Sequence, residues 1–285
     1  MSQPPEQVPA QQQAWPGSEA DLRPSADHGA TSWTGRDRLR GKRAVVTGGD
    51  SGIGRAVAVT FAKEGADVLI AHLPEEADDA AETARLVADQ GRRGLTHEAD
   101  LRTADANRAL AERAVDELGG VDVLVCNAAY QMAHDELEQF PPDQIERTFA
   151  TNVFGPFWLV QALAPQLENG GSVIVTTSVQ AYSPSDHLLD YAATKAALNN
   201  LVGNLAQELG PRGTRVNAVA PGPIWTPLIP ATMPPDKVEG FGSDTPLGRP
   251  GQPVEVAAAF VFLASDEASY VSGTVLGVTG GKPVF

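Results

Sequence analysis

Cysteine is nearly absent from this chain, and basic residues are scarce. Cys126 is the only cysteine among 285 residues, so an intrachain disulfide is impossible and a reducing cytoplasm is the expected location. The five histidines show no spacing typical of metal ligands, so we expect no metal site.

Lysine and arginine number 21 against 36 acidic residues, and the net charge of −15 argues against nucleic acid or an anionic membrane as a partner. The acidic run at 75–79 is expected at the solvated start of a helix.

An apolar stretch is also missing from the N-terminal part of the chain. Residues 1–14 are rich in glutamine and proline and resemble neither a signal peptide nor a membrane anchor. Such a composition cannot form a core of its own. We therefore expect residues 1–40 to form an arm that is either disordered or docked in extended form. If the arm is docked, Trp15 and Trp33 are its expected anchors.

The remaining residues, 41–285, alternate between short β-branched runs and segments of good helix formers. This alternation predicts one α/β domain, a Rossmann-type doubly wound parallel sheet of about seven strands with helices on both faces. The expected strands are 43–47, 67–71, 94–98, 121–126, 173–177, 214–220 and 274–278. The principal expected helices after the first are 75–90, 104–118, 142–167, 190–209 and 254–263.

A glycine-rich turn joins the first expected strand to the first helix, with the pattern Gly-x3-Gly-x-Gly from Gly48 onward. Glycines permit a tight turn and let backbone N–H groups approach a pyrophosphate at the N-terminus of the helix. The turn therefore predicts a dinucleotide site. Its expected cofactor-binding residues are Gly48, Asp50, Ser51, Gly52, Ile53 and Gly54.

The pattern Ser-x12-Tyr-x3-Lys, formed by Ser178, Tyr191 and Lys195, carries the chemistry. Ser178 is expected at the end of a buried strand, and Asp190 is a plausible cap for the helix that holds the other two residues. Positions four apart share a helix face, so the ammonium lies beside the phenol. A nearby cation lowers the pKa of a tyrosine, and such a phenol can exchange a proton as a carbonyl and an alcohol interconvert.

From about Leu39 to the C-terminus, these motifs resemble the short-chain dehydrogenase/reductase family. Asp100 and Leu101 resemble the pair that holds the adenine ring. Residues 127–129 are similar to the family's Asn-Ala-Gly motif, with alanine in place of the glycine. Asn152 resembles a fourth catalytic residue. The further cofactor-binding residues that the resemblance implies are Asn127, Ala128, Ala129, Tyr191 and Lys195, with Pro221, Gly222, Ile224 and Thr226 from the loop that holds the nicotinamide carboxamide.

The resemblance implies an NAD(P)-dependent oxidoreductase that interconverts a secondary alcohol and a ketone, or a primary alcohol and an aldehyde, by hydride transfer. Ser178 would bind the substrate oxygen, Tyr191 would act as acid and base, and Lys195 would bind the nicotinamide ribose. Asn152 would help to hold a water that links Lys195 to solvent. Two alternatives remain: a non-catalytic dinucleotide-binding sensor, and a sugar-nucleotide epimerase or dehydratase, which also uses Tyr-x3-Lys.

The choice between NADP and NAD depends on the end of the second strand. A carboxylate there would repel a 2′-phosphate, but His72 occupies the place and Arg55 adds positive charge nearby. NADP is therefore slightly favoured, and NAD remains open. The loop 180–187 and a Pro- and Gly-rich lid near 226–248 are expected to shape the substrate pocket.

Gln180, Tyr182 and His187 are the candidate substrate residues, and they favour a sugar, a polyol or another polar alcohol. Equally, they can satisfy backbone groups of their own loop. The arm resembles that of a bacterial subgroup with stress-associated and glucose-dehydrogenase-like members. Family resemblance also implies a homotetramer built on helices near 149–167 and 190–209, with a small-molecule carbonyl or alcohol as the other partner.

Overall fold

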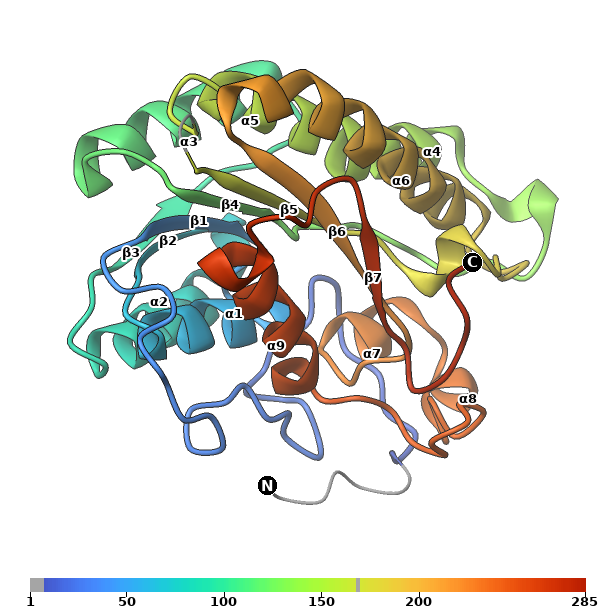
Figure 1. Cartoon of the computed structure of the whole chain (residues 1–285). Helices are drawn as coiled ribbons and strands as arrows, with labels where there is room; N and C mark the ends of the chain where they lie inside the picture. The colour runs from blue at the N-terminus through green and yellow to red at the C-terminus, as the bar shows by residue number, and fades with distance from the viewer. Residues whose placement is uncertain (1–7, 168–169) are drawn as a thin grey trace.

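The computed structural model describes residues 8–167 and 170–285. Seven parallel strands form one sheet in the order β3-β2-β1-β4-β5-β6-β7, which confirms the predicted fold (Figure 1). The chain winds outward from β1 on one side and from β4 on the other, so the strand order reverses between them. At such a point the carboxyl ends of the strands border a ligand crevice. The strands are β1 (Arg43–Thr47), β2 (Asp67–His72), β3 (Gly94–Glu98), β4 (Val123–Cys126), β5 (Ser172–Thr176), β6 (Arg215–Pro221) and β7 (Val275–Val278).

Helices cover both faces of the sheet, with α1, α2 and α9 on one face and α3, α4, α5 and α6 on the other (Figure 1). A separate cluster of buried apolar side chains fills each interface. The principal helices are α1 (Gly52–Lys63), α2 (Ala77–Ala88), α3 (Ala104–Leu118), α4 (Pro142–Phe149), α5 (Gly155–Leu163), α6 (Leu189–Leu209) and α9 (Pro253–Ala264). Shorter turns of helix are η1 (Pro74–Glu76), η2 (Leu137–Gln139), η3 (Ala150–Phe154), η4 (Val179–Ala181), η5 (Gly210–Arg212), η6 (Asp266–Ala268), α7 (Leu228–Thr232) and α8 (Pro235–Val238).

The helix expected over 142–167 is interrupted by η3, which is a π-helical turn. Pro156 has no N–H to donate to the carbonyl of Asn152, so a regular α-helix cannot continue there. Turns of this kind often mark functional sites.

The prediction that Asp190 caps α6 is also wrong. Leu188 caps the helix, and Asp190 lies buried in the first turn, where its carboxylate accepts hydrogen bonds from Thr148 Oγ1 at 2.6 Å and from its neighbour's backbone N–H at 2.8 Å.

The described part of the N-terminal arm, from residue 8, runs in extended and turn conformation along the face that carries α1, α7 and α9 (Figure 1). Val8 and Leu22 are buried against Trp225 and the short helices α7 and α8. Further along, Trp33 donates from its indole nitrogen to Glu64 Oε1 at 3.0 Å. The arm thus packs on the lid region at one end and on the C-terminal end of α1 at the other.

Candidate active site

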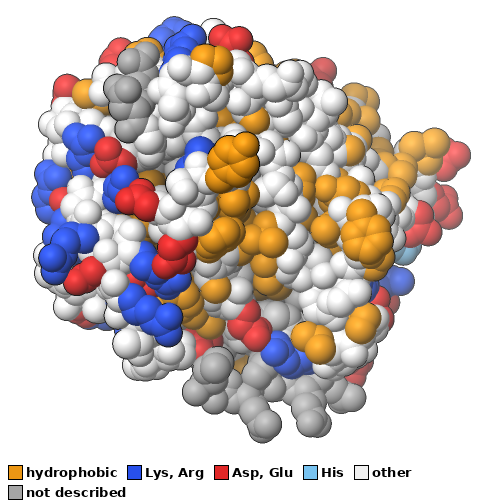
Figure 2. Space-filling model, viewed as in Figure 1, with side chains coloured by type: hydrophobic (Ala, Val, Ile, Leu, Met, Phe, Trp, Pro, Cys, Tyr) orange, Lys and Arg blue, Asp and Glu red, His pale blue; other side chains and the backbone are white. Residues whose placement is uncertain are grey.

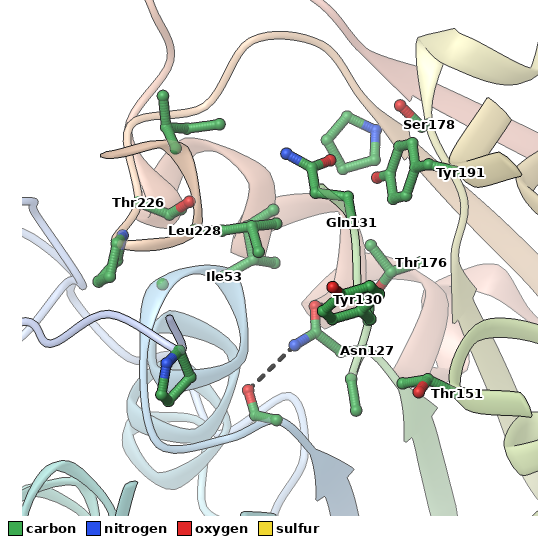
Figure 3. A pocket seen from close by; sticks show the side chains of 18 of the residues that line it. Ile53, Asn127, Tyr130, Gln131, Thr151, Thr176, Ser178, Tyr191, Thr226 and Leu228 are labelled. Carbon is green, nitrogen blue, oxygen red and sulfur yellow. Dashed lines mark hydrogen bonds between the residues drawn. The ribbon is translucent and has the colours of Figure 1, made fainter. Parts of the chain in front are cut away.

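A cavity of about 740 Å³ lies at the carboxyl ends of the central strands, where the topology predicts a crevice. In Figure 3, Ser178 and Tyr191 lie on one side of it, and Ile53, Thr226 and Leu228 lie on the other. Most of the residues selected from the sequence line this cavity. They are Gly48, Asp50, Ser51, Gly52, Ile53, His72, Asp100, Leu101, Asn127, Ala128, Ala129, Ser178, Gln180, His187, Tyr191, Lys195, Pro221, Gly222, Ile224 and Thr226.

The glycine turn has the shape that a pyrophosphate requires. Gly52 has a φ of +50°, and a Cβ atom there would come within 3.0 Å of the Thr226 side chain across the cavity. Gly54 does not line the cavity; a Cβ at this position would lie 1.7 Å from the carbonyl oxygen of Gly48. Gly54 therefore lets the turn close on itself, while Ser51, Gly52 and Ile53 bring the N-terminus of α1 to the cavity. These residues fit a bound dinucleotide.

The end of β4 is tied to this turn. Thr47 Oγ1 accepts hydrogen bonds from the backbone N–H groups of Asn127 at 2.9 Å and Ala128 at 3.0 Å. The Asn127 side chain donates to the carbonyl of Gly48 at 3.0 Å. The structure thus brings the second expected cofactor motif against the first one, because β1 and β4 are neighbours in the sheet.

Ser178, Tyr191 and Lys195 lie together in the buried part of the cavity. Ser178 follows β5, and the other two project from the first turns of α6. The Lys195 ammonium lies 5.3 Å from the centroid of the Tyr191 ring and donates to the carbonyl of Thr176 at 2.8 Å. The segment between β5 and α6 thus brings a hydroxyl, a phenol and an amine to one wall.

Burial controls the protonation of this group. It raises the pKa of Tyr191 to about 12, with a smaller opposing effect from the Ser178 hydroxyl. Burial also lowers the pKa of Lys195 to about 7. The lowering of the Tyr191 pKa expected from its cationic neighbour is therefore absent in this structure, because desolvation of the phenolate is the larger effect. At neutral pH the phenol is protonated.

Asn152 lies behind the cavity wall rather than in it. Its side chain accepts from the backbone N–H of Tyr130 at 2.8 Å and donates to the carbonyl of Tyr130 at 2.9 Å and to Thr194 Oγ1 at 3.1 Å. The π-helical turn thus lets one amide fix both the chain after β4 and the helix that carries the phenol.

Two acidic side chains occupy the end of the cavity near His72. Asp50 is buried, and its Oδ1 atom has no hydrogen-bond partner within the described residues. Burial raises the pKa of Asp50 to about 6, and burial together with the Asp50 charge raises the pKa of Glu76 to about 8. Glu76 is not the solvated residue that the acidic run suggested, because η1 turns it toward Asp50, which lies in a turn distant in sequence.

Arg55 does not contribute a free positive charge at this end of the cavity. Its guanidinium is buried and donates to the Asp50 carbonyl at 2.7 Å, to Thr83 Oγ1 at 2.9 Å and to Asp79 Oδ1 at 3.0 Å. The sequence predicts a basic residue beside the glycine turn, but Asp79 of helix α2 forms an ion pair with it.

The substrate side of the cavity differs in part from the sequence prediction. Tyr182 lies outside the lining with its side chain exposed, because it follows η4 at the surface. Gln180 lines the cavity, although its Oε1 accepts from the backbone N–H of Ser185 at 2.6 Å. His187 also lines it, and its Nδ1 has no hydrogen-bond partner among the described residues. Met233 and Phe241 of the expected lid line the cavity, whereas the lining residues Tyr130, Gln131 and Arg147 were missed by sequence reasoning.

A glycine turn at a sheet switch point, next to a buried serine, tyrosine and lysine, defines a dinucleotide-dependent oxidoreductase. A family model described as Enoyl-(Acyl carrier protein) reductase matches residues 48–282. The chain belongs to the short-chain dehydrogenase/reductase family, whose members use NAD or NADP. Among the described helices, none combines the length and hydropathy needed to cross a membrane.

Relatives match nearly the whole chain. It is 47% identical over 282 residues to the uncharacterized oxidoreductase YhxD of Bacillus subtilis, covering 98% of this chain and 94% of that protein. It is 41% identical over 281 residues to the glucose and ribitol dehydrogenase of Daucus carota, covering 97% of each. A crystal structure of a short chain dehydrogenase from Burkholderia cenocepacia in complex with NADP shares 36% identity, with a TM-score of 0.80, over 86% of this chain and 99% of that one.

Proposed function

We propose that this protein interconverts an alcohol and a carbonyl compound by hydride transfer to or from NADP or NAD, with Tyr191 as the acid and base. The observation that supports this most directly is the placement of Ser178, Tyr191 and Lys195 in one cavity with the glycine turn. The substrate is a secondary alcohol and its ketone, or a primary alcohol and its aldehyde.

Each side chain has one role in the proposed reaction. Ser178 donates a hydrogen bond to the substrate oxygen, and Tyr191 passes its proton to that oxygen during reduction. Burial raises the pKa of Tyr191 to about 12, and the protonated phenol is the donor during reduction. Lys195 stands beside the phenol and binds the nicotinamide ribose, while Asn152 positions the surrounding backbone. The bound cofactor supplies the hydride; the protein supplies orientation and the proton.

NADP is the slightly favoured cofactor in this proposal. The related structure from Burkholderia cenocepacia is a complex with NADP, and β2 ends in His72 rather than in a carboxylate. When Asp50 and Glu76 are ionised, they disfavour NADP. Both line the end of the cavity near His72, where their negative charges repel a ribose 2′-phosphate. NAD therefore remains a second cofactor of the proposal.

A polar substrate such as a sugar or a polyol fits the substrate side best. His187 lines the cavity and brings a polar ring to it, with Nδ1 at 3.6 Å from Asp135 Oδ1 and Nε2 at 3.3 Å from Asp186 Oδ1. The carrot relative is named a glucose and ribitol dehydrogenase, which agrees with this chemistry. Met233 and Phe241 line the same cavity and offer apolar surface to the carbon skeleton of the substrate.

Homotetramer formation is part of the proposal. Phe154 and Phe157 are each 47% exposed at the start of α5, and Leu189 is exposed at the start of α6. Hydrophobic side chains also gather across the face that carries β7, whereas charged side chains lie at its margin near β3 and α2 (Figure 2). Exposed apolar areas of this kind mark subunit contacts. Sedimentation of the purified protein tests the subunit count, and a monomer would contradict this part.

A panel assay tests the reaction itself. Purified protein is mixed with NADPH or NADH and with aldehydes, ketones and sugars, and the loss of nicotinamide absorbance is followed. We expect turnover of at least one carbonyl class with a preference for one cofactor. Binding of the cofactor without turnover of any compound would favour the sensor alternative.

A further inference from the structure

The arm segment 13–19 contacts two walls of the dinucleotide pocket. On one wall, the backbone N–H of Gln13 donates to the carbonyl of Pro230 in the lid helix α7 at 2.9 Å. On the other wall, Trp15 packs against Tyr130, which follows the Asn-Ala-Ala motif at the end of β4, with ring centroids 5.6 Å apart. The lid and the chain after β4 also meet directly, since the Ala133 N–H donates to the Thr232 carbonyl at 3.1 Å and the Gln131 side chain donates to Thr232 Oγ1 at 2.9 Å. The arm adds a second connection between them.

The same segment continues to the floor of the pocket. Glu19 Oε1 accepts from the backbone N–H of Gly52 at 2.6 Å, and the Glu19 backbone N–H donates to Asp79 Oδ2 at 2.9 Å. A Cβ at Gly17 would come within 2.8 Å of the carbonyl oxygen of Pro227, so the segment lies close against the lid between these two anchor points. Each end of the segment is held, and Trp15 lies between them.

Trp15, Tyr130 and Arg147 contact one another as a triad. The guanidinium carbon of Arg147 is 4.1 Å from the centroid of the Trp15 ring and 4.2 Å from that of the Tyr130 ring. The two rings meet edge to face, with an interplanar angle of 70°. Each of these contacts is favourable. All three residues line the pocket, so the triad forms part of its wall.

The donor groups of Arg147 are available to a ligand. Within the described residues the guanidinium forms neither a hydrogen bond nor an ion pair, although it is held between two aromatic rings. Its charge also reaches Asp100, whose pKa is held below its usual range first by the hydrogen bond from Arg102 and to a smaller extent by Arg147. Arg147 thus lines the expected dinucleotide pocket with its donor groups free within the described part of the chain and its position fixed by Trp15 and Tyr130.

We propose that Trp15 and Arg147 are residues of the dinucleotide site, in which segment 13–19 straps the pocket and Trp15 holds Arg147 toward a phosphate of the cofactor. This inference rests on the proposed function, because it assigns the pocket to NADP or NAD. Release of a dinucleotide from beneath the strap requires Trp15 to leave its two partners. Trp15 is a positioning residue here, and its loss affects retention of the cofactor more than it affects proton transfer.

The test measures cofactor release directly, without a substrate. Full-length protein carrying NADPH is mixed with excess NADP, and the decay of the nicotinamide's own fluorescence gives the dissociation rate. We expect Trp15→Ala to accelerate release by about tenfold, the loss of roughly one cation–π and one aromatic contact. Trp15→Phe should restore most of the retention. Arg147→Lys, which keeps the charge and loses the planar stack, should be intermediate.

Trp33→Ala is the matched control, because Trp33 is a half-buried tryptophan of the same arm that packs away from the pocket. It should release NADPH at the wild-type rate. If Trp15→Ala unfolds, hydrogen exchange of the wild type gives a second measurement: bound NADPH should slow exchange at the amides of Gln13 and Glu19. Equal rates of NADPH release in the Trp15→Ala and Trp33→Ala proteins would overturn the strap. So would hydrogen exchange at Gln13 and Glu19 that NADPH leaves unchanged. Neither result would affect the proposed function. A wild type that binds neither NADPH nor NADH overturns the proposed function and the strap with it.

Discussion

The Glu19 carboxylate accepts a 2.6 Å hydrogen bond from the backbone N–H of Gly52, the first residue of α1. Glu19 is buried, and its other side-chain partner is His28 Nε2 at 2.8 Å. Ser51, the residue at the usual capping position, makes no side-chain capping bond within the described part of the chain. A residue from the arm therefore caps the helix that begins at the glycine turn.

Replacing Glu19 by glutamine should lower the free energy of unfolding by about 1–3 kcal/mol at neutral pH, because a charged hydrogen bond is lost in a buried place. Burial alone raises the pKa of Glu19, but the hydrogen bond and charge of His28 and the charge of Arg55 hold it below its usual 4.5. A lowered pKa contributes stability above pH 4.5 that is lost as the pH falls further. Denaturant unfolding at pH 7 and pH 4 measures this difference.

The variant should therefore approach the wild type in stability at acid pH. Glu112→Gln, a substitution of an exposed glutamate on α3, serves as the control and should change little at either pH. A Glu19→Gln protein as stable as this control at pH 7 would show that the cap contributes nothing.

Tyr191→Phe should leave cofactor binding nearly unchanged and reduce turnover by about 10²- to 10⁴-fold, the usual contribution of a positioned general acid. The phenyl ring keeps the packing of the buried side chain, so the loss reports the hydroxyl alone. Tyr182→Phe removes a hydroxyl from an exposed ring outside the cavity lining, and its turnover should match the wild type. Steady-state rates with either reduced cofactor, and binding followed by nicotinamide fluorescence, separate the two effects. Comparable losses in both variants would remove Tyr191 from its proposed role.

The sequence predicted the sheet and many of the residues that line the cavity, because both depend on local patterns. β-branched runs mark the strands, and glycine or asparagine at a strand's carboxyl end marks the turns that meet at the switch point. The proposed catalytic trio was visible because Tyr191 and Lys195 lie one turn apart on a single helix.

The features that were missed depend on contacts between distant segments. Glu76 looked like an exposed helix start until η1 brought it to the glycine turn, and Arg147 carried no signal of the aromatic rings on either side of it. The pKa of Tyr191 is raised rather than lowered for the same reason, because it depends on packing between distant segments. The spacing predicts that Lys195 lies nearby, but only the packed structure shows that burial outweighs its charge.

Stability should fall as the pH rises from about 5 to 9, in part because of Glu76. Burial and the charges of Asp50, Glu75 and Asp79 raise its pKa from 4.5 to about 8. A raised pKa contributes stability that is complete below 4.5 and is lost as the pH rises through 8. Glu76→Gln keeps an acceptor for the Leu73 N–H. The substitution should reduce the fall in the free energy of unfolding across this pH range by about 1–2 kcal/mol. Thermal unfolding across the pH range measures it, with Glu112→Gln on α3 as the control; parallel curves for the two variants would contradict the prediction.

Asp50→Asn should shift cofactor preference toward NADP. Asp50, Glu76 and His72 line one end of the cavity beside the end of β2, where a carboxylate discriminates against a ribose 2′-phosphate. As the pH rises through about 6 and about 8, the pKa values of Asp50 and Glu76, the wild type should bind NADP more weakly, whereas NAD binding should change little. The asparagine removes one of the two charges, so the ratio of NADP to NAD affinity at pH 8 should rise by about three- to tenfold. Titration of both cofactors by fluorescence measures the ratio, and Asp105→Asn, at an exposed position on α3, is the control. An unchanged ratio in Asp50→Asn would place the 2′-phosphate away from this acidic end, and His72 would then be the residue to vary.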